Sequence, residues 1–211
     1  MYQISKRLLD LISATIVFII FFPVFLIAPI LIKLDSAGPI FYKQRRVGKN
    51  GHEFLMYKFR NMVQNADQIL IEDHQFNKKF KQKTGWKVDA NHDPRITKVG
   101  KWLRKFSIDE LPQLINIFKS DMSMVGPRAY RNDQAGNEIE EQLKLYPKLR
   151  SQIQIVLTVK PGLTGPWQTS GRNILPWDQR VKLDAEYATQ NSILNDIYII
   201  LKTPFAMFSK W

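Results

Sequence analysis

Two adjacent carboxylates, Asp109 and Glu110, are the residues of this sequence whose types and position best suit chemistry. They stand between two runs with apolar residues at helical spacing, one over 98–106 and the other over 111–118. Ser107, three residues before Glu110, predicts a capping box at the start of the second helix. The pair is therefore expected at a helix N-terminus, where the macrodipole favours negative charge and phosphate. The alternative is that both acids only complement that dipole.

Two loops carry residue types that phosphate sites need. Gly126-Pro127-Arg128 offers a backbone turn and a guanidinium suited to bidentate phosphate contact. The segment 160–173 combines glycines and hydroxyls with Trp167 and Arg172, so its backbone can approach a ligand and its ring can stack on a base or a sugar. Each loop alone is a weak signal, because such turns are common. Neither a P-loop nor a G-x-G-x-x-G fingerprint is present, which leaves ATPase and Rossmann interpretations without support.

The composition narrows the kinds of chemistry and of partner. The 211-residue chain has no cysteine, which excludes a disulfide, a thiolate zinc site and a cysteine nucleophile. Its net charge is +12, from 31 Lys and Arg against 19 Asp and Glu. Such a balance implies an anionic partner: nucleic acid, an anionic lipid surface or a phosphorylated substrate.

An apolar stretch without any charge, 11–32, predicts a membrane-anchoring segment. Pro23 stands near its middle and removes a helix hydrogen bond, so we expect a break there. Basic residues flank both ends, and the positive-inside rule places both flanks in the cytoplasm. A helix that breaks and leaves by the same leaflet satisfies this rule; a single-pass helix and a buried core helix are the alternatives. We therefore predict a re-entrant helix-break-helix anchor over 1–35 and a cytosolic domain with interfacial helices over 36–211.

The basic domain is expected to rest on an anionic leaflet, where each juxtamembrane Lys or Arg contributes about 1 kcal/mol. The helix over 98–106 carries Trp102 and Phe106 beside lysines, a pattern typical of a helix that lies in the membrane interface. A helix packed on the core with a solvated basic face is the alternative.

The chain as a whole predicts an α/β fold: a helix-rich mixed domain with a small β-hairpin or sheet, anchored by the re-entrant helix. Two β-like runs, 39–44 and 53–60, flank Asn50-Gly51, which is a strong tight-turn signal. No alternating βα pattern is present, so no doubly wound sheet is expected. The other elements expected are a charged helix over 61–83, a mobile surface loop over 84–94, a helix over 137–151, a strand over 152–159, a loop over 160–173 and helices over 175–211.

An acidic pair, basic loops and an anchor in one leaflet together favour phosphoryl chemistry at the bilayer surface. An aspartate can act as a covalent nucleophile toward phosphate. Mg²⁺, held by a carboxylate and by substrate phosphates, would neutralise the charge that gathers there.

Five sequence blocks resemble the small monotopic phosphoglycosyltransferases of the bacterial sugar transferase family. The blocks are KRLLD (6–10), YKFRNM (57–62), DPRITKVGKWLR (93–104), SIDELPQLINIFKSDMSMVGPR (107–128) and KPGLTGPWQTSGRN (160–173). The resemblance covers nearly the whole chain. It implies transfer of a sugar-1-phosphate, with a hexose favoured by the WQTSGRN block, from a UDP-sugar to polyprenol (undecaprenyl) phosphate with release of UMP. This would be the first membrane step of exopolysaccharide, capsule or glycan synthesis, at the cytoplasmic face of the bacterial cell membrane.

The resemblance also implies a role for each matching residue. Asp109 would attack the β-phosphate of the UDP-sugar and hold the phosphosugar covalently, with Mg²⁺ against it. Glu110 would assist in metal positioning or proton handling. The residues implied to contact phosphate, nucleotide or sugar are Arg104, Arg128, Arg172, Lys58, Arg60 and Trp167.

Three functions other than sugar-1-phosphate transfer are considered as alternatives. A non-catalytic membrane-associated scaffold of a polysaccharide assembly complex has no need of both carboxylates and the arginines. Nucleic-acid binding needs a recognition motif, and none is present, so no nucleic-acid partner is expected. Ordinary glycosyl transfer would release UDP in place of UMP. The expected partners are a UDP-sugar, polyprenol phosphate and an anionic leaflet; a homo-oligomer and contact with downstream glycosyltransferases stay open.

Overall fold

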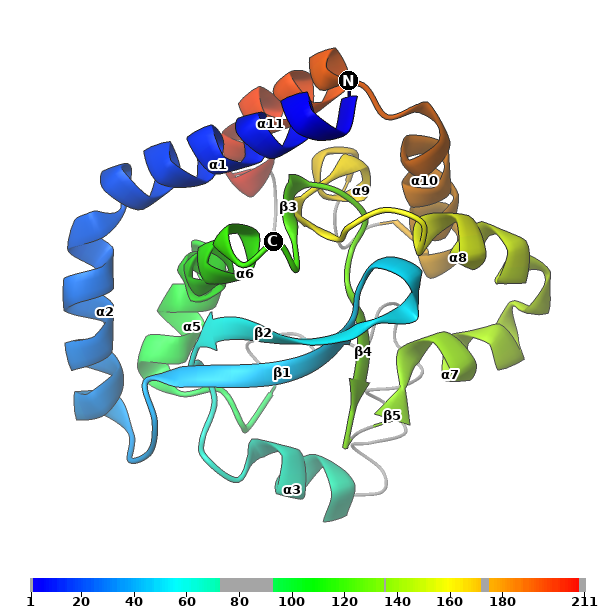
Figure 1. The fold of residues 1–211 in the computed structure, drawn as a ribbon. Helices are drawn as coiled ribbons and strands as arrows, with labels where there is room; N and C mark the ends of the chain where they lie inside the picture. The colour runs from blue at the N-terminus through cyan, green and yellow to red at the C-terminus, as the bar shows by residue number, and fades with distance from the viewer. Residues whose placement is uncertain (1, 73–92, 135, 172–174, 209–211) are drawn as a thin grey trace.

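The computed structural model describes residues 2–72, 93–134, 136–171 and 175–208 (Figure 1). Two helices lead this part of the chain, α1 (Tyr2–Ile20) and α2 (Phe22–Asp35), and they are bent relative to each other by 61°. Among the described residues no single helix is long and apolar enough to cross a membrane, whereas the two helices of this bent pair together have the length and the apolar composition to do so. The break precedes Pro23, and that proline lies in the first turn of α2. Backbone N–H groups of a first turn make no intrahelical hydrogen bond, so the N–H that proline lacks is not needed there.

Two small sheets form the β-structure (Figure 1). A four-stranded antiparallel sheet has the order β2-β1-β4-β5, and a parallel pair joins β3 to β6. The strands are β1 (Phe41–Val47), β2 (Glu53–Phe59), β3 (Ser123–Val125), β4 (Tyr130–Asp133), β5 (Gly136–Asn137) and β6 (Gly162–Thr164). Strands β1 and β2 pair over their whole lengths, which confirms the predicted hairpin. Asn50 and Gly51 supply its turn, with φ of 56° and 79°.

Helices make up most of the rest and pack around the sheets, which confirms the helix-rich α/β prediction. They are α3 (Ala66–Glu72), α5 (Lys98–Lys105), α6 (Leu114–Phe118), α7 (Glu138–Leu145), α8 (Arg150–Val156), α9 (Pro166–Thr169), α10 (Trp177–Gln190) and α11 (Ile193–Phe208), with 3₁₀ helices η1 (Lys49–Gly51), η2 (Ile108–Gln113) and η3 (Pro147–Leu149). Part of the predicted 61–83 helix, and all but the end of the predicted 84–94 loop, lie outside the described residues. The predicted loop over 160–173 contains β6 and α9.

Two local predictions are wrong. Residues 152–159 form no strand, because Leu149, Ile153 and Val156 are buried together at helical spacing and the chain folds there as η3 and α8. The capping box is absent as well: Ser107 lies in the left-handed region, with φ of 54°, and its side chain makes no cap hydrogen bond to η2.

Helix α2 packs directly on the segment that carries the carboxylate pair. Its Ala28 and Ile32 share one buried cluster with Leu103 of α5 and with Ile108 and Leu111 of η2. Figure 1 shows α2 along the outer edge of the molecule, beside α5. The apolar N-terminal helices and the acidic turn are therefore joined by a common core.

Helix α1 presents an apolar face outward and a polar face inward. The outward face carries Ile4, Leu8, Ile12 and Ile16, each at least 51% exposed. The inward face carries Asp10, which is buried. An apolar stripe on the outside of a folded body needs an apolar environment, which a bilayer supplies.

Buried hydrogen bonds fasten the inward face of α1 to the domain. Asp10 accepts from the Ser123 hydroxyl at 2.8 Å and from the Met124 N–H at 2.9 Å, both in β3. Lys6 forms ion pairs with Asp10 at 3.0 Å and with Asp196 of α11 at 3.3 Å. The KRLLD block thus holds α1 against the strand that leads into the Gly-Pro-Arg turn.

Candidate active site

The carboxylate pair lies in the first turn of η2, as the sequence predicted, although the helix is of the 3₁₀ type. Asp109 is 5% exposed, and its Oδ2 accepts a hydrogen bond from Asn61 Nδ2 at 2.7 Å. Glu110 is more exposed and forms an ion pair with Lys58, with 3.1 Å between Oε1 and Nζ. Two adjacent acids therefore have different surroundings, the first buried against an amide and the second beside a lysine.

Asn61 was not predicted as a site residue, yet it orients Asp109. Its backbone is held by α5, because its carbonyl accepts a hydrogen bond from the Thr97 N–H at 3.2 Å. Gly100 of α5 packs against the same carbonyl so closely that a Cβ there would stand 2.0 Å from the oxygen. The glycine in DPRITKVGKWLR thus lets α5 support the residue that holds Asp109.

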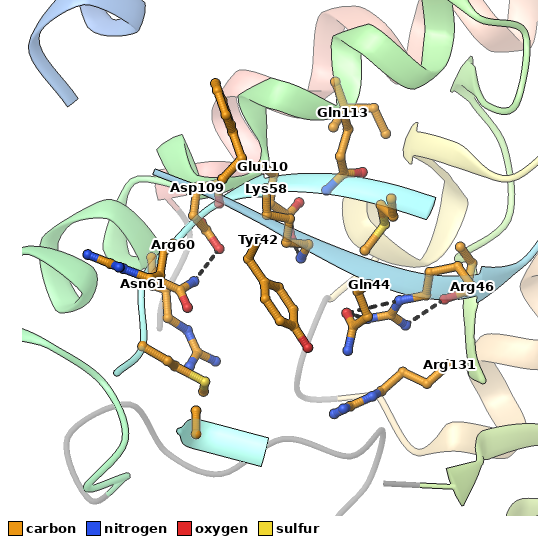
Figure 2. A pocket seen from close by; sticks show the side chains of 18 of the residues that line it. Tyr42, Gln44, Arg46, Lys58, Arg60, Asn61, Asp109, Glu110, Gln113 and Arg131 are labelled. Carbon is orange, nitrogen blue, oxygen red and sulfur yellow. Dashed lines mark hydrogen bonds and ion pairs between the residues drawn. The ribbon is translucent and has the colours of Figure 1, made fainter. Parts of the chain in front are cut away.

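A cavity of about 290 Å³ lies beside Asp109 (Figure 2). Its charged lining is mostly basic: Arg46, Lys58, Arg60, Arg95, Arg104, Arg128 and Arg131, against Asp67, Asp93, Asp109 and Glu110. All of the predicted site residues line it except Arg172, which lies outside the described residues. A basic cavity with a carboxylate in its wall can bind phosphate groups and bring an oxygen nucleophile against them.

Two of the predicted residues also have structural contacts. The guanidinium of Arg60 donates to three carbonyls within residues 32–37, at 2.5 to 3.2 Å, and so caps the end of α2. Trp167 is buried, with the Arg180 guanidinium 4.9 Å from the centre of its ring. Arg60 therefore ties the cavity wall to α2, and Trp167 contributes an aromatic ring to the lining of the same cavity.

The two glycine-bearing loops predicted from the sequence form one structure. Reciprocal backbone hydrogen bonds of 2.9 Å connect them beside the β3–β6 pair. A Cβ at Gly126, Gly162 or Gly165 would lie within 2.4 Å of backbone atoms of the facing loop. The glycines let two main chains touch, and this contact brings Arg128 and Trp167 to the same cavity.

Arg46 and Arg131 lie at the end of the cavity away from the carboxylate pair (Figure 2). Arg128 joins them in an arginine cluster, because Arg46 and Arg128 both form ion pairs with Glu138. Arg128 Nη1 is 2.5 Å from Glu138 Oε1, and Arg131 Nη2 is 2.8 Å from Asp133 Oδ2. Burial, together with the charges of the other two arginines, lowers the pKa of Arg46 to about 9. Arg46 and Arg131 were not predicted from the sequence, where they belong to no recognised block.

Asp184 of α10 supports the Gly-Pro-Arg turn from the protein interior. Its Oδ2 accepts a hydrogen bond from the backbone N–H of Arg128 at 3.1 Å. Burial raises the pKa of this carboxyl to about 8, against the opposing effects of that hydrogen bond and of the charges of Arg128 and Arg180. The turn is thus held by a buried acid that favours its protonated form.

The donor set at the carboxylate pair fits a metal ion shared with a substrate. No group of three or more His, Cys, Asp or Glu within the described ranges could enclose a metal ion. Mg²⁺ is commonly held by one or two carboxylates together with substrate phosphates. Asp109 and Glu110 both line the cavity with oxygen donors and meet that requirement.

A basic cavity with a fixed carboxylate, built onto a bent apolar helix pair, defines a membrane-associated enzyme that acts on phosphate-bearing substrates. The chain belongs to the family described as bacterial sugar transferase, whose sequence profile matches residues 1–210.

Individual relatives share the same extent of sequence. The chain is 41% identical over 200 residues to the exopolysaccharide production protein ExoY of Sinorhizobium fredii, covering 95% of this chain and 84% of that protein. It is 37% identical over 206 residues to the undecaprenyl-phosphate galactose phosphotransferase of Salmonella typhimurium, covering 94% of this chain and 39% of the relative. It is 34% identical over 212 residues to the UDP-glucose:undecaprenyl-phosphate glucose-1-phosphate transferase of Escherichia coli, covering 98% of this chain and 40% of the relative.

Proposed function

We propose that this protein transfers a hexose-1-phosphate from a UDP-sugar to undecaprenyl phosphate and releases UMP, as the first membrane step of exopolysaccharide or related glycan synthesis. The observation that carries the proposal is the buried Asp109, fixed by Asn61 in the wall of a basic cavity that is packed onto the apolar helix pair. The names of the relatives support both substrates: two are transferases to undecaprenyl phosphate, and one of them uses UDP-glucose.

The reaction proceeds in two displacements at one phosphorus atom. The Asp109 carboxylate attacks the β-phosphorus of the UDP-sugar, the bond from that phosphorus to the bridging oxygen breaks, and UMP leaves with the electron pair. An oxygen of undecaprenyl phosphate then attacks the same phosphorus and displaces the Asp109 carboxylate. Lys58, Arg104 and Arg128 stabilise charge on the substrate phosphates, because all three line the cavity.

Asp109 and Glu110 are the residues that would hold Mg²⁺. The ion, when bound, would neutralise charge on the substrate phosphates. Removal with EDTA is expected to abolish UMP release, and added Mg²⁺ to restore it. Thermal unfolding should be unchanged by EDTA, because the described residues provide no protein-only metal cage. Full activity in EDTA would remove the metal from the proposal.

The proposed arrangement in the membrane assigns residues 1–35 as the re-entrant anchor and residues 36–211 as the catalytic domain on the cytoplasmic face. The outward apolar stripe of α1 supports contact of this helix with lipid. Trp102 of α5 is 49% exposed, and Phe106, which follows the last residue of α5, is 38% exposed. These exposed rings favour the interfacial helix over the core-packed alternative. Labelling of an introduced cysteine at residue 2 from outside the cell would establish a single pass.

Identification of the released nucleotide tests the reaction. Purified protein in detergent is incubated with Mg²⁺ and individual UDP-sugars, with and without undecaprenyl phosphate. We expect UMP, in a burst stoichiometric with enzyme before the acceptor is added. Release of UDP would show glycosyl transfer, and no release from any UDP-sugar would favour the scaffold.

Substitution of the nucleophile gives the matched test. Asp109→Asn is expected to abolish the UMP burst and to leave membrane association unchanged. Asp178→Asn serves as the control, because Asp178 lies on the surface of α10 in an ion pair with Lys182 and does not line the cavity. Activity of Asp109→Asn near that of the control would remove Asp109 from its proposed role.

A further inference from the structure

Asn116 is a fully buried polar residue in the middle of the short apolar helix α6. The residue is 0% exposed, and its neighbours Leu114 and Ile117 belong to a buried apolar cluster that also contains Met56 of β2. A buried amide is unfavourable unless its hydrogen bonds are made. What the amide of Asn116 binds therefore explains why a polar side chain is placed there.

The amide of Asn116 binds the outer edge of the four-stranded sheet. Strand β2 stands at the end of the order β2-β1-β4-β5, so no strand of the described sheet lies beyond it. At this edge Asn116 Nδ2 donates to the Leu55 carbonyl at 2.8 Å, and Asn116 Oδ1 accepts from the Tyr57 N–H at 3.0 Å. The amide thus pairs with one acceptor and one donor of the edge, as a neighbouring strand would. In Figure 1, α6 lies on the side of β2 opposite β1.

Asp121 holds this amide in one orientation. Asn116 Nδ2 also donates to Asp121 Oδ2 at 3.1 Å, and the backbone N–H of Asp121 donates to the Asn116 carbonyl at 3.0 Å. Both N–H groups of the amide are therefore used. A flipped amide would turn an N–H group toward the Tyr57 N–H, which is itself a donor. The contact with β2 is consequently specific in direction as well as in position.

Asn116 belongs to a series of contacts that align the carboxylate turn with β2. Further along the chain from the Asn116 contact, Lys58 pairs with Glu110, and Asn61 donates to Asp109. As residue numbers rise from 55 to 61 on this side, those of the partners fall from 116 to 109, so η2 and α6 run antiparallel to the edge. Asn116 is bonded to the backbone of β2, and a single buried asparagine is able to fix the register of two packed elements.

We propose that Asn116 is a positioning residue for the transfer reaction, which sets the register of the carboxylate turn against Lys58 and Asn61. The inference rests on the proposed function, because it acts through the role assigned there to Asp109. The contacts of Lys58 with Glu110 and of Asn61 with Asp109 are 3.1 and 2.7 Å long. A slide of about 1 Å along the edge would take both out of good hydrogen-bond geometry. Asn116 itself does not line the cavity, so its effect passes through these neighbours.

The kinetics of Asn116→Ala test the proposal. We expect kcat for UMP release to fall at least about tenfold, because a misplacement of about 1 Å commonly lowers a rate about 100-fold. The KM for the UDP-sugar should stay within about threefold of wild type, since Arg46 and Arg131 of the cavity lie on β1 and β4.

Val181→Ala is the control for stability. Val181 is buried in the cluster around Trp177 and does not line the cavity, so this variant should lower Tm and leave kcat unchanged. An Asn116 with a merely structural role would behave in the same way. A lowered Tm with wild-type kcat in Asn116→Ala would therefore overturn the inference.

Amide hydrogen exchange tests the contact with β2 without any turnover. In Asn116→Ala the Tyr57 N–H loses its acceptor, so the peptide that contains Tyr57 should exchange faster than in wild type and in Val181→Ala. Unchanged exchange would show that this amide does not hold the edge and would overturn the inference. If Asn116→Ala does not fold, Asp121→Ala is used, which leaves the amide free to turn. Its kcat should fall about threefold, and wild-type kcat would overturn the proposal.

The proposed function and this inference fail in different ways. Failure of the proposed function appears as no UMP release by the wild-type protein, or as full activity of Asp109→Asn. Failure of the inference appears as normal release by wild type, loss of release in Asp109→Asn and unchanged kcat in Asn116→Ala.

Discussion

Replacing Gly100 by alanine is expected to damage the reaction without adding any atom to the cavity. The new methyl carbon would stand 2.0 Å from the carbonyl oxygen of Asn61, 2.6 Å from its carbonyl carbon and 2.9 Å from its Cα. All three are backbone atoms, which cannot rotate aside as a long side chain would. Because an ordinary contact of this kind is at least 3.4 Å, α5 or the chain after β2 must move by roughly 1.4 Å.

A movement of this size is large compared with the tolerance of the hydrogen bond that Asn61 makes to Asp109. Along the bond it would lengthen the present 2.7 Å to roughly 4 Å, which is no longer a hydrogen bond. A misplacement of about 1 Å commonly lowers an enzymatic rate about 100-fold. Overpacking lowers the free energy of unfolding by about 1–3 kcal/mol, so the variant should still fold.

The assay is the rate of UMP release from the UDP-sugar with undecaprenyl phosphate in excess. We expect kcat of Gly100→Ala to fall about 100-fold, with a smaller change in KM, because Arg46 and Arg131 of the cavity lie on β1 and β4 and not on the segments that move. Lys101→Ala, on the exposed face of the same helix, is the control and should retain activity. A folded Gly100→Ala enzyme with kcat within twofold of wild type would refute the reasoning from Gly100 to Asp109.

Two further predictions concern stability. Burial raises the pKa of Asp184 from 3.8 to about 8, so between these values the folded state keeps a proton that the unfolded state loses, and stability falls as the pH rises. In wild type we therefore expect Tm to fall between about pH 5 and pH 8, and Asp184→Asn should make this fall less steep. An unchanged slope of Tm against pH would contradict this. Arg60→Gln should lower the free energy of unfolding by about 2–4 kcal/mol, because its charged hydrogen bonds cap α2, with less than a tenfold rise in KM for the UDP-sugar. Normal unfolding with a larger rise in KM would instead assign Arg60 to phosphate binding.

Features encoded over a few neighbouring residues were predictable from the sequence. The hairpin followed from two β-like runs around Asn50-Gly51, and the acidic turn followed from two amphipathic runs that meet at Asp109. The strand over 152–159 was mispredicted, since a short apolar run fits both alternation and helical spacing. Tertiary packing decided the outcome, because burial of Ile153 and Val156 beside Trp177 needs one helical face.

Features of the site that depend on distant partners were not predictable. Asn61 acquires its role from a hydrogen bond to a residue 48 positions later, and Arg46 from a carbonyl 83 positions later. No local pattern marks either residue, because an asparagine after a strand and an arginine within one are ordinary in isolation. The resemblance located Asp109 and Arg128, whereas Arg46 and Arg131 became visible only when the fold brought them to the same cavity.

The hydrogen bonds of α1 also determine an order of events during synthesis. The hydrogen bond between Asp10 and Ser123 cannot form until Ser123 has been synthesised, 113 residues after Asp10. The hydrogen bond between Tyr2 and Asp196 likewise needs a residue that is synthesised 194 positions later. At typical rates of translation, roughly 6 to 23 s separate the synthesis of Asp10 from that of Ser123. Throughout this interval the apolar stripe of α1 is exposed and the folded body does not yet exist. We therefore expect the nascent helix to reach the bilayer first, so that the body completes its folding around a helix already lying in its leaflet.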